Sequence, residues 1–209
     1  MTEITANSNR LSQWLFNPFR FIAGFKALLL GLVIILLSAF VGSLSNTHFD
    51  GVLDIHSGLE APLWFFFAEV LIDWIYVVVP LFFFGLIVSR SAFRIIDVLG
   101  TQALARWPYL IAAIVMLPDA NQRVLTYLMS KLTQAASTSA VSSIDVLVFV
   151  FAMIVIILMV IWTVALMYQA YTVSCNIRGA SAIITFVVSL IGAEVLSKIA
   201  ILRLVSFFS

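Results

Sequence analysis

Five segments of this chain are apolar enough, and long enough, to cross a lipid bilayer, and they make up most of its 209 residues. A helix rises about 1.5 Å per residue, so about 20 residues cover a hydrocarbon core of roughly 30 Å. Charged residues are 10% of the chain, against about 25% in soluble domains. The sequence therefore predicts an all-α fold, a polytopic transmembrane helical bundle with spans at 27–44, 63–89, 95–117, 146–171 and 180–204.

The part of the chain before the first span has a different composition. Trp14, Phe16, Phe19 and Phe21 lie beside Arg20, a mixture typical of segments at the level of the lipid headgroups. We therefore expect residues 1–26 to form an interfacial N-terminal segment and residues 27–209 to form one five-span transmembrane domain, since no block of mixed composition is long enough for a second, soluble domain.

The third span is polar in its first half. Asp97, Gln102 and Arg106 precede Pro108, which should kink the helix. Only residues 109–117 are continuously apolar, and nine residues cannot cross a bilayer. Either the polar half faces protein or cytosol, or the segment is partly interfacial.

Residues 121–134 have the pattern of an amphipathic helix. Leu125, Leu128, Met129 and Leu132 recur at helical spacing, whereas the basic residues of the segment lie outside this stripe. We expect a short helix on the membrane surface, followed by a linker of small residues at 135–143.

Basic residues beside the spans predict the orientation. The side that holds the N-terminus carries six Lys and Arg residues, and the opposite loops carry two, with Arg203 near the last exit. Basic residues favour the cytoplasmic side. The N-terminus is therefore expected in the cytoplasm and the C-terminus outside, on the evidence of Arg10, Arg20, Lys26, Arg90, Arg94 and Arg178 against Arg123 and Lys131.

Four charged residues are expected inside the bilayer. Glu69 and Asp73 share a face of the second span, and Glu194 and Lys198 lie four residues apart in the fifth. Each charge costs about 3 kcal/mol at the centre of a membrane, so it needs compensation. Because the second and fifth spans run in opposite directions, depth places Lys198 near Glu69 as well as Glu194. A structural polar clamp is the favoured interpretation, and a proton or cation pathway is the alternative.

Other polar groups suggest less chemistry. Arg90, Arg94, Asp97 and Arg106 are predicted at the cytoplasmic side. The loop after the first span contains metal-ligand residue types, but their intervals match no established pattern. We expect no metal and no cofactor, although the weak metal candidates are His48, Asp50, Asp54 and His56.

Several motifs together resemble a known family. The early Asn17-Pro-Phe-Arg-Phe21, the stretch from Asp97 to Pro108, and Trp162 followed by Tyr168-Gln-Ala-Tyr171 are similar to compact prokaryotic members of the Yip family, the Ypt/Rab-interacting membrane proteins. The resemblance implies five spans with a cytoplasmic N-terminus. Eukaryotic members are linked to small GTPases through a larger cytosolic N-terminal region. Only residues 1–26 precede the first span here, and the acidic-Leu-Tyr-Gly-Pro motif is missing, which argues against a small GTPase partner.

The sequence thus predicts a non-enzymatic integral membrane protein, placed in a bacterial inner membrane, that acts in membrane organisation or protein interaction. No arrangement of nucleophile and base indicates an enzyme, and a net charge of +1 gives no sign of nucleic-acid binding. The expected partners are the lipid bilayer, other membrane proteins or a second copy of the chain. The alternative is a small transporter that uses Glu69, Asp73, Glu194 and Lys198, which would then line a wet cavity.

Overall fold

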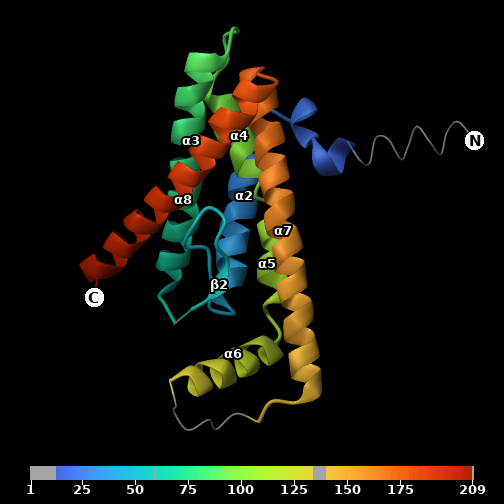
Figure 1. The fold of residues 1–209 in the computed structure, drawn as a ribbon, viewed down its shortest axis with the longest axis vertical. Coiled ribbons are helices and arrows are strands. Elements are labelled where there is room, and N and C mark those ends of the chain that lie inside the picture. Colours follow the sequence, from blue (N-terminus) through green and yellow to red (C-terminus); the bar gives the residue numbers. More distant parts are fainter. Residues whose placement is uncertain (1–12, 59, 134–139, 209) are drawn as a thin grey trace, which may run out of the picture.

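The computed structural model describes residues 13–58, 60–133 and 140–208. It is a helical bundle (Figure 1), and five of its helical segments are long and apolar enough to cross a membrane, as predicted. Four of them are continuous helices. These are α2 (Gly24–Ser43), α3 (Leu63–Val88), α7 (Ser143–Cys175) and α8 (Ala180–Phe208).

The third segment is broken into two helices, α4 (Ile95–Leu104) and α5 (Pro108–Val115). The break falls just before Pro108, as predicted, because proline has no N–H to donate and its ring crowds the preceding turn. The polar half faces protein. Gln102 is buried and its Nε2 donates to the carbonyl of Met167 at 3.0 Å, and Thr101 Oγ1 lies 2.7 Å from Ser174 Oγ. The first of the two alternatives is therefore correct.

Two glycines bring α2 and α4 into close contact. A Cβ atom built on Gly31 would lie 2.5 Å from the main-chain nitrogen of Leu104, and one built on Gly100 would lie 2.5 Å from the carbonyl oxygen of Gly24. Small residues allow membrane helices to approach at backbone distance. This contact holds the polar half of the third segment inside the bundle.

Helix α6 (Asp119–Leu132) lies across one end of α7 (Figure 1). The helix was predicted, but the buried face is Ala120, Asn121 and Val124, and most of the predicted apolar stripe is exposed. Arg123 Nη2 lies 2.5 Å from Asp145 Oδ1 of α7, and this ion pair fixes the helix. The exposed stripe residues are Leu128, Met129 and Leu132, while Leu125 is half-buried. Gln134 and residues 135–139 of the expected linker lie outside the described residues.

The N-terminal segment packs beside α7. A short 3-10 helix, η1 (Pro18–Arg20), buries Phe19, and Trp162 Nε1 of α7 donates to the carbonyl of Leu15 at 3.3 Å. The ring of Trp162 also contacts Phe16. Trp14, Phe16 and Phe21 are exposed, as expected of an interfacial segment, whereas residues 1–12 lie outside the described part of the chain.

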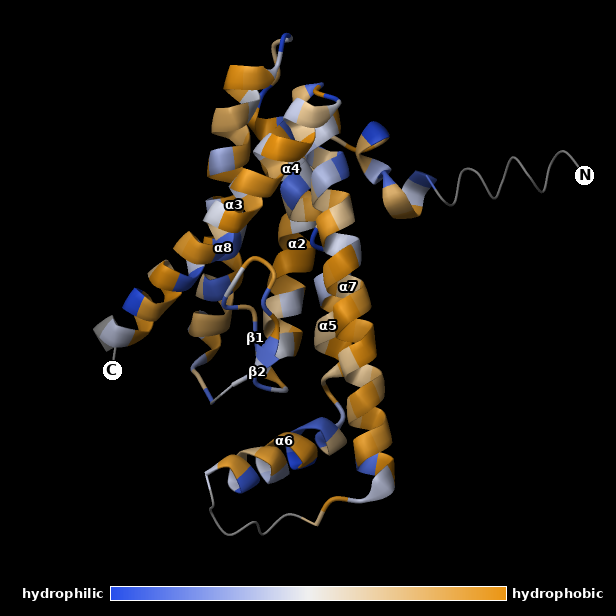
Figure 2. Ribbon diagram, viewed as in Figure 1, coloured by the Kyte–Doolittle hydropathy of each residue, from blue (hydrophilic) through white to orange (hydrophobic). Residues whose placement is uncertain are grey.

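Helices α7 and α8 diverge from a tight connection, and α8 packs mainly on α3 (Figure 1). Asn176 ends α7 at a φ of 48° and Gly179 precedes α8 at a φ of 75°. Glycine adopts such left-handed backbone without strain. Figure 2 shows long hydrophobic stretches on α7 and α8 and hydrophilic residues gathered at the helix ends and around the loop between α2 and α3.

Candidate functional site

The connection between α2 and α3 turns back alongside these helices instead of extending beyond them (Figure 1). Its two short strands, β1 (Thr47–His48) and β2 (His56–Ser57), pair antiparallel with His48 opposite His56. Phe49 and Val52 at the centre are buried. We call residues 45–58 the inner hairpin. The segment does connect two spans, as predicted, but about half of it is packed inside the protein.

Polar side chains of the helices satisfy the backbone of the inner hairpin. The Phe49 N–H donates to Glu69 Oε2 at 3.4 Å and the Leu53 N–H donates to Glu194 Oε2 at 2.8 Å. An unsatisfied backbone group costs several kcal/mol away from water, so a non-helical segment at membrane depth needs such partners. The carboxylates of α3 and α8 therefore accept hydrogen bonds from backbone N–H groups of the inner hairpin, besides pairing with charged side chains.

The same carboxylates take part in side-chain pairs. His48 Nδ1 lies 2.9 Å from Glu69 Oε1, both groups being buried. Lys198 Nζ lies 2.6 Å from Asp54 Oδ2 of the inner hairpin and 3.2 Å from Glu194 Oε1. The prediction that α3 and α8 are neighbours and that Lys198 pairs with Glu194 is confirmed. The expected contact of Lys198 with Glu69 is wrong, because the inner hairpin supplies each with its own partner.

Asp73 differs from the other three members of the cluster. It is fully buried, and in the described part of the chain neither of its carboxylate oxygens has a hydrogen-bond partner. Arg106 is buried beside it and donates from Nη2 to the main-chain oxygen of Asp73 at 3.0 Å. Arg106 also lines a small cavity of about 10 Å³, which approaches the least volume that holds one water molecule.

Arg106 is thus separated from the residues with which it was grouped. Arg94 Nε lies 3.0 Å from Asp97 Oδ2 near the start of α4, and Arg90 is exposed in the connection before it. Arg106 lies past the end of α4, about 18 Å further along a helical path from Arg94 at 1.5 Å per residue. Arg90, Arg94 and Asp97 thus lie close together in the chain around the start of α4, whereas Arg106 lies deeper in the bundle; the cytoplasmic location of the four residues stays a prediction.

The weak metal candidates belong to separate pairs. His48 contacts Glu69, Asp54 contacts Lys198, and His56 Nε2 lies 3.1 Å from Asp50 Oδ2. Across residues 13–58, 60–133 and 140–208, no group of three or more His, Cys, Asp or Glu side chains could hold a metal ion. The structure instead uses these side chains within the inner hairpin and between it and the helices.

The Asp50–His56 pair makes the inner hairpin sensitive to pH. The Asp50 carboxylate raises the pKa of His56 from 6.5 to about 9, and His56 lowers the pKa of Asp50. The pKa of His56 is higher in the folded protein than in the unfolded chain. The pair therefore contributes fully to the free energy of unfolding below pH 6.5, and this contribution is lost as the pH rises through about 9. Replacing His56 with Gln should lower the unfolding temperature at pH 6 and leave it unchanged at pH 10.

The size of that effect is small because both side chains are partly exposed, and about 1 kcal/mol is the upper end for such pairs. Thermal unfolding in detergent at the two pH values measures it. A difference between wild type and His56→Gln that persists undiminished at pH 10 would show that the histidine acts through packing and not through its charge.

The Lys198–Asp54 pair should show coupling in a double-mutant cycle. Lys198→Met and Asp54→Asn each remove one partner, so the effect of the double mutant on the free energy of unfolding should be smaller than the sum, by about 1 kcal/mol for a partly exposed pair. Lys198→Met combined with Arg123→Gln is the matched control, since Arg123 pairs with Asp145 of α7 and shares no partner with Lys198, and it should be additive.

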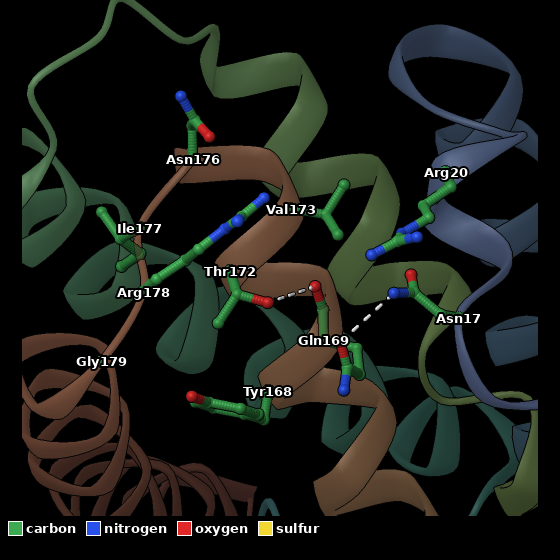
Figure 3. Close-up of a pocket in the computed structure, with 10 residues that line it drawn as sticks. All are labelled: Asn17, Arg20, Tyr168, Gln169, Thr172, Val173, Asn176, Ile177, Arg178 and Gly179. Atoms are coloured by element: carbon green, nitrogen blue, oxygen red, sulfur yellow. Dashed lines mark hydrogen bonds between the residues drawn. The ribbon is translucent and has the colours of Figure 1, made fainter.

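A second polar feature lies where α7 ends, at the other end of the bundle from α6 (Figure 1), and Figure 3 shows it in close-up. A cleft of about 560 Å³ forms between η1, the last turns of α7 and the connection to α8, and Asn17, Arg20, Gln169, Thr172, Asn176 and Arg178 are among its lining residues. Asn17 Nδ2 donates to Gln169 Oε1 at 3.2 Å. We call this cleft of about 560 Å³ the polar cleft. It joins two of the segments on which the family resemblance is based.

Sequence reasoning missed the inner hairpin and the contribution of Tyr109, whose hydroxyl donates to the carbonyl of Val52 at 2.6 Å. One signal was present. The loop contains no Lys or Arg, and apolar residues alternate with its acidic residues, namely Phe49, Val52, Leu53 and Ile55. These apolar side chains would be exposed if the loop lay in water, so their presence indicates that part of the loop is buried.

Comparison of the chain with protein-family models, with curated proteins and with solved structures found no match in any of the three. The resemblance to the Yip family therefore stays a prediction.

Proposed function

We propose that this chain is a non-enzymatic integral membrane protein of Yip-like five-span architecture that acts by organising the membrane around it and by binding other membrane proteins or a second copy. The observation that supports this is the use of the charged cluster. Glu69, Glu194 and Lys198 each bind the inner hairpin, so they serve the architecture. Neither the polar cleft nor the small cavity is lined by these three residues.

The proposed orientation has the N-terminus in the cytoplasm of a bacterial inner membrane. Arg20 and Arg178 lie together at the polar cleft, and the connection that carries Arg90 reaches the same end, since Asn176 Nδ2 donates to Ser91 Oγ at 3.0 Å. Basic residues at one end support a cytoplasmic location. Reporter fusions after Arg94 and after Arg178 should both report cytoplasm, and a fusion after Lys131 should report the opposite side. Arg94 and Lys131 on one side would refute the topology.

Hydrogen exchange tests the architectural role of the cluster. In the full-length protein in lipid nanodiscs, the amides of Phe49 and Leu53 should exchange as slowly as those of the helix centres, because each donates to a carboxylate inside the bundle. The Arg90 amide, in the same exposed connection, is the control and should exchange fast. Fast exchange at Phe49 and Leu53 would mean that water reaches the cluster, as a transport pathway requires.

One observation favours a second candidate, a proton-handling transporter. Asp73 is buried without a hydrogen bond to its carboxylate, beside Arg106, and such carboxylates often lie on proton pathways. Proton flux into vesicles that contain the protein decides between the candidates. We expect no flux above that of empty vesicles; flux that disappears in Asp73→Asn while the protein remains folded would favour the transporter.

A further inference from the structure

The polar cleft carries two basic side chains that lack acidic partners. Figure 3 shows Arg20, from η1, and Arg178, from the α7–α8 connection, both extending over it. No ion pair within the described residues includes either of them, and no acidic residue lines the cleft. Two guanidinium groups that converge on one space, with no carboxylate between them, favour an anion there.

Neutral donors complete the lining. Asn17 Nδ2 donates to Gln169 Oε1, so this hydrogen bond uses the acceptor of the Gln169 amide and leaves its Nε2 group as a donor. Asn176 and Thr172 also line the cleft (Figure 3). The Thr172 hydroxyl donates to the carbonyl of Gln169 at 3.0 Å, and Asn176 Nδ2 donates to Ser91 Oγ at 3.0 Å, so of these two side chains only Asn176 keeps a further N–H for a ligand. Gly179 also lines the cleft, and α8 begins at the next residue, so the N-terminal end of that helix, with its partial positive charge, is close by.

The polar cleft lies beside a segment with the composition of the lipid headgroup region. The exposed rings of Trp14 and Phe16 belong to the segment that leads into η1, and Phe16 contacts Trp162. Tryptophan and phenylalanine beside an arginine are typical of the headgroup level of a bilayer. The volume of about 560 Å³ lies within the usual range of small-ligand sites and could take a glycerophosphate group.

We propose that the polar cleft binds a phosphate group, supplied by an anionic lipid headgroup or by a soluble phosphate, with Arg20 and Arg178 as its principal ligands. Guanidinium groups bind phosphate oxygens in pairs, and hydrogen bonds to a charged group are about twice as strong as neutral ones. This site is distinct from the inner hairpin and goes beyond the proposed function, since it does not depend on what the charged cluster does.

The test uses the full-length protein in a neutral detergent and measures its unfolding temperature with increasing probe. The probes are dihexanoyl phosphatidylglycerol, glycerol phosphate and inorganic phosphate, with sodium chloride at equal ionic strength to correct for screening. We expect saturable stabilisation. Binding at lower concentration by phosphatidylglycerol than by glycerol phosphate identifies a lipid site, and equal binding identifies a soluble phosphate.

Three variants address the ligands. Arg178→Gln should weaken binding at least tenfold, as should Arg20→Gln, because each removes a charge-assisted contact. Gln169→Glu keeps the size of the side chain and the acceptor for Asn17, but it adds a negative charge inside the cleft and should weaken phosphate binding to a similar extent.

Arg90→Gln is the matched control, an exposed arginine at the same end of the bundle that does not line the cleft. It should leave the affinity within twofold of wild type. The proposal is overturned if no phosphate probe gives saturable stabilisation, or if Arg90→Gln weakens binding as much as Arg178→Gln, since binding would then reflect only the general positive charge of that end.

Discussion

A single methyl group added at Gly31 is expected to destabilise the protein by about 3 kcal/mol, the upper end of the range for overpacking. The new Cβ would lie 2.5 Å from the Cβ of Ala103 and 2.5 Å from the main-chain nitrogen of Leu104. A backbone atom cannot rotate away, so α2 and α4 must separate along their whole contact. The free energy of unfolding of Gly31→Ala, measured by denaturant titration in mixed micelles, gives the effect.

The chain offers a matched control in another transmembrane helix. A Cβ atom built on Gly192 of α8 meets nothing within 4 Å. Gly192→Ala should therefore be neutral or stabilise by up to about 1 kcal/mol through helix propensity. Gly100→Ala should resemble Gly31→Ala, since its Cβ would lie 2.5 Å from the carbonyl oxygen of Gly24. If all three alanine variants behaved alike, α2 and α4 would not make the close contact described.

The helices could be predicted from the sequence because a bilayer imposes a length and a composition on each span. The predicted start of the second span, residue 63, is the observed start of α3, and the predicted start of the fifth, residue 180, is the observed start of α8. Pro108 marked the break in the third segment, since a missing N–H is a local property. Such features depend on residues close together in the chain.

The inner hairpin could not be predicted, because its place depends on partners far away in the sequence. Leu53 donates to Glu194, 141 residues later, and Asp54 pairs with Lys198, 144 residues later. The apolar residues of the loop indicate that part of it is buried, but they do not identify the carboxylates against which it packs. The depth of Glu69 and Lys198 was estimated correctly enough to place them in one region, but depth does not show what lies between two side chains.

The side of α6 that contacts protein could not be predicted for a related reason. Helical spacing identifies an apolar stripe, but the stripe can face lipid as well as protein. Asn121 is buried because its Nδ2 donates to the carbonyl of Val115 at 3.0 Å, and Gln122 donates to the carbonyl of Ser45 in the inner hairpin. Polar contacts thus orient α6, and they leave Leu128 and Leu132 exposed. On the proposed orientation, these residues would face the outer surface of the bilayer.

The largest effect is expected at Glu69. Glu69→Leu removes the acceptor that His48 Nδ1 and the Phe49 N–H share, and breaking a buried pair on one side costs about 3–5 kcal/mol. Glu69→Gln keeps an acceptor oxygen and should cost about 1–2 kcal/mol. Unfolding of both variants in mixed micelles measures the two values, and hydrogen exchange at Phe49 should become faster in Glu69→Leu.

A double-mutant cycle then separates the two halves of the cluster. Glu69→Leu and His48→Leu should be coupled by about 2 kcal/mol. Glu69→Leu leaves the buried imidazole of His48 without its carboxylate partner, and His48→Leu then removes that imidazole. Glu69→Leu and Lys198→Met should be additive within about 0.5 kcal/mol, because Lys198 pairs with Asp54 and Glu194 instead. If Glu69 were coupled to Lys198 as strongly as to His48, α3 and α8 would be joined by a direct interaction between these two side chains. That result would contradict the conclusion that each of them acts through the inner hairpin.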